Sequence, residues 1–317
     1  MLNNYQYFLV LARSTSISQA AEELNVSHQG LSLYLKNLER ELGAPLFERV
    51  PRLVLTEAGK AVLEAFSDVE FRERDLRGRL DDITKNERGE FRFGLPEGRF
   101  RILMPDLLPL FKQRWPFVKL NTRCAPSAIL RELLLRNELD AALLDQTAAD
   151  PAAMDLMPML EERLFLAVSE GMLASFFGKK LRLRRGSAEL ADFAGLPFVL
   201  NEPGATSRTA IDVFCATRGI VLNCVMELPQ LDLHLMLASR DYAAAFCWSM
   251  YLAVVEQNNS RDTGHRLRVF PVKELSARNC LMFAVKKRRS LPSYGRDLIS
   301  LLRKSCTHFA VPNTSVI

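Results

Sequence analysis

The sequence lacks the features that mark membrane, metal-dependent and disulfide-bonded proteins. No apolar run approaches the roughly 18 residues that cross a bilayer. The six cysteines form no C-x-x-C pair, and the four histidines form neither an H-E-x-x-H motif nor a cluster with cysteine. We therefore expect free thiols, no metal, no cofactor and no membrane partner. The N-terminus also lacks a basic stretch followed by an apolar one, which predicts a cytoplasmic protein.

Positive charge is scarce in the N-terminal part of the chain. Residues 1–90 carry 12 Lys and Arg against 15 Asp and Glu, a net charge of −3, whereas the remaining residues carry +8. With 48% hydrophobic and 25% charged residues, the chain of 317 residues has the composition of a globular protein. At about 100–200 residues per domain, it should form two or three domains. Because residues 1–90 carry a negative net charge, evidence for DNA binding must come from the pattern of residues rather than from charge.

The N-terminal segment predicts three helices. Apolar residues recur at helical spacing over residues 5–12, 17–24 and 31–42. Ser16 and Gln19 have the form of a capping box, and Gly43 is placed to end the third helix. The third helix is expected to bury one face, made of Leu31, Leu35, Leu38 and Leu42. Two short helices around a turn near Val26 are typical of a helix-turn-helix.

The third helix and the segment after it offer groups that suit DNA. Hydroxyl, amide, imidazole and ammonium groups can contact phosphates and base edges in the major groove. The predicted DNA-contacting residues of the helix are Ser27, His28, Gln29, Ser32, Tyr34 and Lys36. Two extended pieces after Gly43 predict a hairpin, or wing, with Arg49 and Arg52 at its tip. Both arginines are placed to reach phosphates or the minor groove.

Four stretches of this segment resemble the LysR-type transcriptional regulators. They are Ala20–Ser27, Leu38–Gly43, Leu46–Arg49 and Leu55–Gly59. The resemblance implies a winged helix-turn-helix over residues 1–58 that binds double-stranded DNA at an interrupted palindromic operator. Leu33 and Tyr34 stand where the family often carries Arg or Gln, which leaves the operator sequence open. The alternative interpretation of the pattern is a three-helix packing module that does not bind DNA.

Residues 59–89 predict a long linker helix and a hinge. Alternating steps of four and three connect its apolar seam, with one charged exception: Val62, Phe66, Val69, Glu73, Leu76, Leu80 and Ile83. Such a seam predicts pairing with a second subunit, in a homodimer or homotetramer that also uses the effector domain and suits a palindrome. The alternative is a helix that packs on its own effector domain.

From residue 90 to residue 317, short apolar strands alternate with helices, which predicts an α/β domain with two sheets. Strands are expected at 91–94, 118–123, 139–144, 164–168, 196–200, 221–226, 243–246 and 281–285. Helices are expected at 102–115, 127–137, 206–217, 231–238 and 292–309. The layout resembles the periplasmic-binding-protein-like (type 2) effector domain of the same family. The resemblance implies subdomain I at about 90–161 and 270–317, subdomain II at about 162–269, and crossovers near Glu161–Leu164 and Arg266–Phe270.

Ligands of open α/β sheets bind beyond the carboxyl ends of strands, near helix N-termini. The predicted effector contacts in such loops are Pro96, Glu97, Arg99, Ser127, Asn201, Thr206, Arg208 and Phe246. The hydroxyls of Ser127 and Thr206 suit a polar effector, and Arg99 and Arg208 suit an anion. These residues can equally be N-caps and surface ion pairs, so the pattern does not identify the ligand.

The sequence thus predicts a DNA-binding transcriptional regulator whose operator binding responds to a small-molecule effector, with an anion as one candidate. Two other readings stay open: an enzyme or solute binder that uses the cleft, and a DNA-binding repressor with a vestigial pocket. We expect no enzyme, because the cleft loops contain no histidine and no Ser/His/Asp set or phosphate loop is visible. Cys215 and Cys224 are expected to be buried core residues rather than a redox pair.

Overall fold

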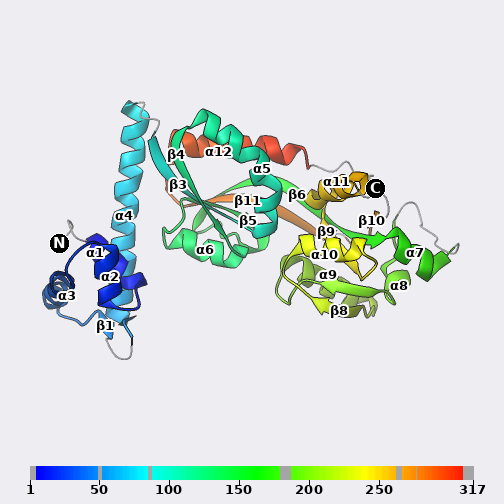
Figure 1. Ribbon diagram of the computed structural model, residues 1–317, viewed down its shortest axis with the longest axis horizontal. Coiled ribbons are helices and arrows are strands. Elements are labelled where there is room, and N and C mark those ends of the chain that lie inside the picture. The colour runs from blue at the N-terminus through cyan, green and yellow to red at the C-terminus, as the bar shows by residue number, and fades with distance from the viewer. Residues whose placement is uncertain are drawn as a thin grey trace. The chain divides into compact units, whose positions relative to one another are not determined.

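A computed structural model describes residues 5–48, 52–84, 88–178, 187–261, 266–275 and 277–309. They form two compact units, one built mainly from the N-terminal helices and the other from the α/β segment that follows (Figure 1). The first unit contains α1 Tyr5–Arg13, α2 Ile17–Glu23, α3 His28–Leu42, β1 Phe47–Glu48, β2 Val54–Leu55 and α4 Glu57–Thr84. The strands β1 and β2 pair antiparallel, as expected of a wing.

Local hydrogen bonds set the ends of the helices that make the turn. The Ser16 hydroxyl accepts a hydrogen bond from the backbone N–H of Gln19 at 3.2 Å, and the Ser27 hydroxyl accepts one from Gly30 at 3.1 Å. The Gln19 side chain accepts from the backbone N–H of Thr15 rather than completing a capping box with Ser16. Gly43 ends α3 with a φ of 69°, a backbone conformation that favours glycine.

The core of the first unit is formed by side chains of α1, α2, α3 and α4, with α1 packed on α4 and α2 packed on α3. Phe8, Leu31 and Leu35 are fully buried. The rings of Phe8 and Phe66 meet edge to face at 5.5 Å, which ties α1 to α4. Leu42, expected on the buried face of α3, is 40% exposed because it lies in the last turn of the helix.

The seam of α4 is divided between two environments. Phe66 is buried, and Val62 and Val69 pack against the core of their own unit. Glu73, the charged exception, accepts a hydrogen bond from the Tyr5 hydroxyl, and this bond lowers the pKa of the carboxyl. Farther along, Leu76 is 55% exposed. The periodic seam therefore serves partly as intrachain core, which the heptad pattern did not predict.

The second unit is a twisted α/β assembly. Its first part contains β3 Arg88–Leu95, α5 Glu97–Arg114, β4 Phe117–Cys124, α6 Ser127–Leu135, β5 Ala141–Asp145, η2 Gln146–Ala148 and β6 Met154–Ser169. Its middle part contains α7 Glu170–Phe177, α8 Leu190–Phe193, β7 Pro197–Leu200, α9 Thr206–Arg218, β8 Asn223–Glu227, α10 Leu231–Ser239 and β9 Ala244–Trp248. Its last part contains η4 Ser249–Tyr251, α11 Leu252–Arg261, β10 Leu267–Pro271, β11 Arg278–Lys286 and α12 Ser293–Thr307.

The long strand β6 joins two subdomains. Its first half pairs with β11, in the order β4-β3-β5-β11-β6, and its second half pairs with β9 and β10, in the order β6-β9-β7-β8. The change of partner falls between Arg163 and Leu164, inside the expected first crossover. In the first subdomain, α5 and α12 cover one face of the sheet and α6 covers the other (Figure 1).

Several boundaries differ from the sequence-based expectation. Strand β6 begins at Met154 instead of Leu164, and α5 begins at Glu97 instead of Ile102. The segment expected as the second crossover is strand β10, which pairs with the second half of β6. The chain therefore returns to subdomain I after Pro271, because β11 begins at Arg278. Helices α7 and α11 were not predicted at all.

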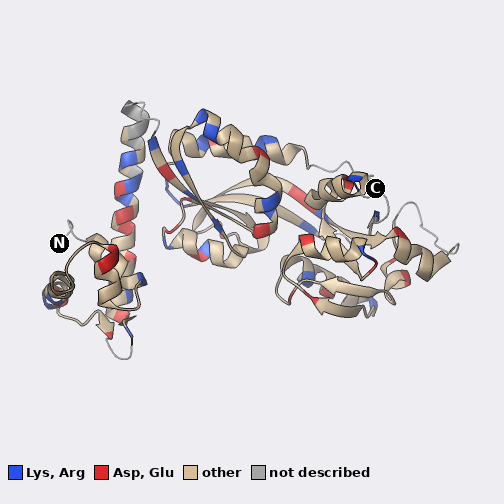
Figure 2. Cartoon of the chain, in the orientation of Figure 1, with Lys and Arg blue, Asp and Glu red and all other residues tan. Residues whose placement is uncertain are grey.

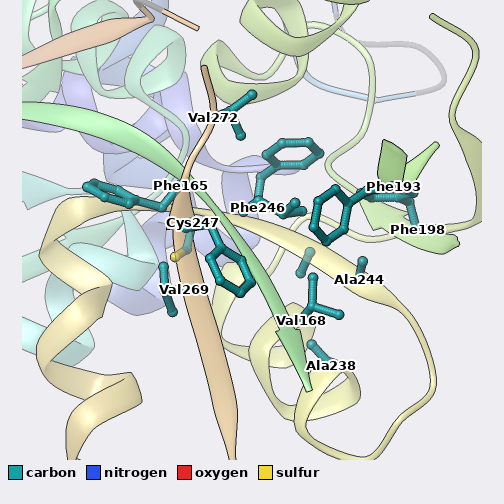
Figure 3. Close-up of a cluster of buried hydrophobic side chains, with 14 of the residues drawn as sticks. Phe165, Val168, Phe193, Phe198, Ala238, Ala244, Phe246, Cys247, Val269 and Val272 are labelled. Atoms are coloured by element: carbon teal, nitrogen blue, oxygen red, sulfur yellow. The ribbon is translucent and has the colours of Figure 1, made fainter. Parts of the chain in front are cut away.

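Aromatic rings fill the core of subdomain II (Figure 3). Phe198 on β7 and Phe246 on β9 stack at 5.6 Å, and Phe193 packs against Phe270 at 6.1 Å. Because this core is rigid, it fixes the carboxyl ends of β7 and β9, where the loops of subdomain II begin. None of the helices described here is sufficiently long and apolar to cross a membrane.

Candidate functional site

One face of α3 presents polar side chains to solvent. With 3.6 residues per turn, Gln29, Ser32, Lys36 and Asn37 project from the same side, opposite the buried Leu31 and Leu35. Gln29, Lys36 and Asn37 are exposed and Ser32 is half-buried. His28 is exposed in the first turn. Four of the predicted DNA contacts, His28, Gln29, Ser32 and Lys36, are thus accessible together.

Tyr34 and Ser27 are placed differently from the expectation. The Tyr34 ring packs edge to face on Tyr7 at 5.4 Å, and burial raises the pKa of its hydroxyl to about 12. Tyr34 therefore supports the fold rather than joining the exposed face, because it lies on the side of α3 that meets α1. The Ser27 hydroxyl is exposed but is already used as the N-cap of α3.

The wing presents one arginine that the structure describes. Arg52 is exposed, just before β2. Arg49, the other predicted wing contact, lies outside the described residues. Figure 2 shows that α4 carries charges of both signs.

A cleft of about 740 Å³ lies between the two subdomains of the α/β unit. The N-termini of four helices, α5, α6, α9 and α10, border it. Their free backbone N–H groups and helix dipoles favour acceptor groups on a ligand. Six of the eight predicted effector contacts line this cleft: Pro96, Glu97, Arg99, Ser127, Asn201 and Thr206.

Arg99 lies in the floor of the cleft as half of a buried ion pair. Its guanidinium lies 2.5 Å from the carboxylate of Glu162 on β6, and both side chains are at least 95% buried. Burial is the largest influence on Arg99 and disfavours its charged form, but Glu162 acting together with Tyr251, Asp145 and Cys306 outweighs burial, so the pKa of the guanidinium is raised. Burial raises the pKa of the Glu162 carboxyl, against the opposing effect of Arg99. The charge of Arg99 is thus already matched within the protein.

Hydrogen bonds orient the hydroxyls of the cleft. Ser127 donates to the carboxylate of Asp145 at 3.1 Å, and the other carboxylate oxygen accepts from Asn279 at 2.6 Å. Across the cleft, the hydroxyls of Thr147 in subdomain I and Thr206 in subdomain II lie 3.2 Å apart. This contact joins the two walls of the cleft.

Two predicted effector contacts do not line the cleft. Arg208 binds Asp212 at 2.9 Å, Glu227 at 2.6 Å and the backbone carbonyl of Asn201 at 2.8 Å, so its charge is committed to subdomain II. Phe246 is 2% exposed and belongs to the core shown in Figure 3. Strand β9 continues to Trp248, and it is this last residue that reaches the cleft.

Several lining residues were missed from sequence. They include the charged residues Arg131, Asp145 and Asp232 and the aromatic residue Tyr251, whereas Glu202 and Trp248 also line the cleft and lie in segments that the sequence did indicate. With Glu97 and Arg99, the lining holds four carboxylates against two guanidinium groups. The Tyr251 hydroxyl lies so close to Gly98 that a Cβ there would collide with it. No local sequence signal marks Tyr251, which reaches the cleft through tertiary packing, whereas Asp232 lies in the first turn of α10, a helix start that the sequence predicted.

Cysteine and metal chemistry receive little support from the described residues. Cys215 is buried, and burial raises the pKa of its thiol, as expected of a core cysteine. Cys224 is exposed on β8, contrary to the expectation that it is buried. Within the ranges described, no group of three or more His, Cys, Asp or Glu side chains is arranged to hold a metal ion.

Comparison with known proteins agrees with both halves of this architecture. The family model for the bacterial regulatory helix-turn-helix protein of the lysR family matches residues 2–60, and the LysR substrate binding domain matches residues 84–307. The transcriptional activator CmpR of Synechocystis sp. is 27% identical over 229 residues, or 72% of each chain. A CysB regulator of Burkholderia cenocepacia is 24% identical over 306 residues, covering 95% of this chain and 93% of that protein.

Solved structures share the fold. A full-length OxyR variant from Pseudomonas aeruginosa covers 96% of this chain and 97% of its own, with a TM-score of 0.72 and 19% identity. Together with the family models, the winged helix-turn-helix and the two-subdomain cleft show what kind of protein this is. The chain belongs to the LysR family of DNA-binding transcriptional regulators, with an N-terminal helix-turn-helix and a C-terminal effector-binding domain.

Proposed function

We propose that this regulator recognises its operator through the exposed face of α3. Gln29 and Ser32 read base edges, His28 assists at the first turn, and Lys36 and Arg52 contact phosphates. The observation that carries this assignment is the accessible set of hydrogen-bonding side chains on a helix whose opposite face is fully buried. Arg49 joins the phosphate contacts on the strength of the sequence alone.

We infer that the cleft between the subdomains binds a small-molecule effector. Ser127 and Thr206 offer hydroxyls at helix N-termini, and Pro96, Glu97 and Asn201 shape the surrounding wall. Because Arg99 is already paired with Glu162, and Arg101 pairs with the lining carboxylates of Glu97 and Asp232, we expect a neutral or zwitterionic molecule rather than a simple anion.

Effector binding would act on DNA through the opening angle of the two subdomains. They are joined by β6 and by the return after β10, so a ligand that touches both walls biases closure. It can shift the equilibrium only by its difference in affinity for the two states, typically about 1–3 kcal/mol. We further propose a homo-oligomer that places two α3 helices on the two halves of a palindrome.

We also propose that the protein works without catalysis and in the cytoplasm, where a bacterial regulator meets its DNA. Support comes from the relatives, which are transcriptional regulators, and from a cleft built of helix N-termini and an internally matched ion pair. Turnover of a bound compound during equilibrium binding would contradict this assignment.

Selection from a pool of random duplexes tests the DNA assignment. The full chain should enrich an interrupted palindrome and protect it from nuclease, with an affinity that falls steeply with salt. Retention of DNA without any enriched sequence or footprint would contradict a specific regulator and favour non-specific binding.

A thermal-shift screen with amino acids and small carboxylic acids tests the cleft. The most stabilising compound should lose affinity in Thr206→Val, which removes a cleft hydroxyl from the first turn of α9. Thr217→Val, an exposed change near the end of the same helix, is the control and should bind normally. Equal losses in both variants, or none in either, would contradict the proposed site.

A further inference from the structure

One large apolar side chain lies on the exposed face of α3. Leu33 is 59% exposed, whereas Leu31 and Leu35 are fully buried. At helical spacing, its surface neighbours are Gln29 four residues before, and Lys36 and Asn37 three and four residues after. Ser32 precedes it directly. Leu33 is therefore surrounded by hydrogen-bonding side chains, of which Gln29, Ser32 and Lys36 are assigned above to DNA.

The structure gives Leu33 no evident role within the fold. It is not among the residues that pack against the core of the N-terminal unit, whose described members include the other apolar residues near it, Val26 and Tyr34. Single exposed apolar residues are common on protein surfaces and need no explanation in general. This one lies in the centre of a polar recognition face, where a side chain without hydrogen-bonding groups cannot contact phosphates or polar base edges.

Major-groove base edges include one apolar group, the C5-methyl of thymine. We propose that Leu33 is a specificity residue that selects thymine by packing against this methyl group. The inference rests on the proposed placement of α3 in the major groove. Cytosine presents an N4 amino group and no methyl at the equivalent edge, so contact with Leu33 disfavours it by leaving a polar group desolvated.

Deoxyuridine provides a direct test, because it differs from thymidine by the methyl group alone. Starting from the site selected by the full chain, each thymine is replaced in turn by deoxyuridine and the affinity is measured. One symmetric position should lose affinity roughly fourfold for each half-site, as expected for about one buried carbon group. The other positions should change little.

A double-mutant cycle connects that methyl group to Leu33. Leu33→Ala should weaken binding to the thymine site by a similar factor and make the protein indifferent to deoxyuridine there. Leu33→Met, which keeps a long apolar side chain, should retain the preference for thymine. Leu42→Ala removes the other exposed leucine of α3 and should also retain it.

Three results would overturn the inference while leaving sequence-specific binding intact. The first is native protein that tolerates deoxyuridine at every position of the selected site. The second is a Leu33→Ala variant that keeps the full deoxyuridine penalty. The third is a Leu33→Ala variant that changes the mass of the oligomer in solution, which would make Leu33 a protein contact. Failure to select any site would instead overturn the DNA-reading face on which the inference depends.

Discussion

Glu161 and Glu162 are neighbours on β6 whose side chains meet opposite environments. Glu162 is completely buried against Arg99, whereas Glu161 is 56% exposed and pairs with Arg278 at 2.6 Å. Alternation along a strand places one residue inside and the next outside. The sequence identified Arg99 as a cleft residue but did not identify its partner, because Glu162 lies 63 positions away and only the sheet brings the two together.

Glu162→Gln should destabilise the effector domain by about 3 kcal/mol, because it leaves the buried Arg99 charge uncompensated. Glu161→Gln is the matched control and should cost about 0.5 kcal/mol or less, since an exposed ion pair contributes little. Urea unfolding followed by tryptophan fluorescence measures both, because Trp115 and Trp248 lie in the α/β unit and the chain has two tryptophans. Similar losses in the two variants would contradict the assigned burial.

Tyr34→Phe should leave operator affinity unchanged, because the Tyr34 ring packs on Tyr7 instead of joining the exposed face of α3. Lys36→Ala, two residues along the helix, should weaken binding to all DNA sequences and reduce its salt dependence. Mobility-shift titrations compare them. A specific loss of operator affinity in Tyr34→Phe would restore the original expectation that this hydroxyl reads DNA.

Features of helices and strands that depend on neighbouring residues were predicted well from the sequence. Features that depend on packing between distant parts of the chain were not. The turn follows from the caps Ser16 and Ser27, and the wing and the start of α9 at Thr206 follow from short-range sequence pattern. The seam of α4 has the same heptad spacing throughout, yet Phe66 is buried by α1 while Leu76 is 55% exposed. Periodicity shows which face is apolar but does not show what covers it.

Leu76→Arg should weaken self-association, because it places a charge in the exposed part of the α4 seam. Glu64→Arg, on the exposed outer side of the same helix, controls for the added charge. Sedimentation velocity over a range of concentrations measures the oligomer. If both variants keep the native mass, α4 does not supply the subunit contact and the seam serves the intrachain core alone.

Helix α10 introduces a pH dependence through His234. The ring is buried and its Nε2 lies 2.8 Å from the carbonyl oxygen of Leu228, to which the neutral form donates. Burial lowers the pKa of His234 below 6.5, so the unfolded chain binds the proton more readily. The free energy of unfolding therefore keeps its full value, as far as His234 is concerned, above about pH 6.5. As the pH falls below that, protonation of His234 in the unfolded chain lowers the free energy of unfolding by up to about 1.4 kcal/mol per pH unit.

His234→Gln should remove this slope between pH 7.5 and 5.5, because glutamine can donate to Leu228 without titrating. His308→Gln replaces an exposed histidine and should keep the native slope. Urea unfolding monitored by tryptophan fluorescence at several pH values supplies the comparison. A native slope in His234→Gln would assign the acid sensitivity to other groups.

Taken together, the two units divide the work of a regulator between a DNA-reading face and a ligand cleft. Local motifs together with the resemblance to the LysR-type regulators predicted this division, because capping residues, helix spacing and the rhythm of strands are local properties that a sequence displays directly. The cleft lining was predicted in part: helix starts such as Ser127 and Thr206 were found, whereas Arg131, Asp145 and Tyr251 were not. The residues that were missed reach the cleft through tertiary packing, for which no periodic signal exists.

The most direct test compares Gln29→Ala and Arg52→Ala on the selected operator and on scrambled DNA across a range of salt concentrations. We predict that Gln29→Ala weakens operator binding by about 1–3 kcal/mol and spares scrambled DNA, because it removes a base contact. Arg52→Ala should weaken both and flatten the salt slope by about one unit, because it removes a phosphate contact. Equal losses for Gln29→Ala on the two DNAs would contradict the reading of bases by α3.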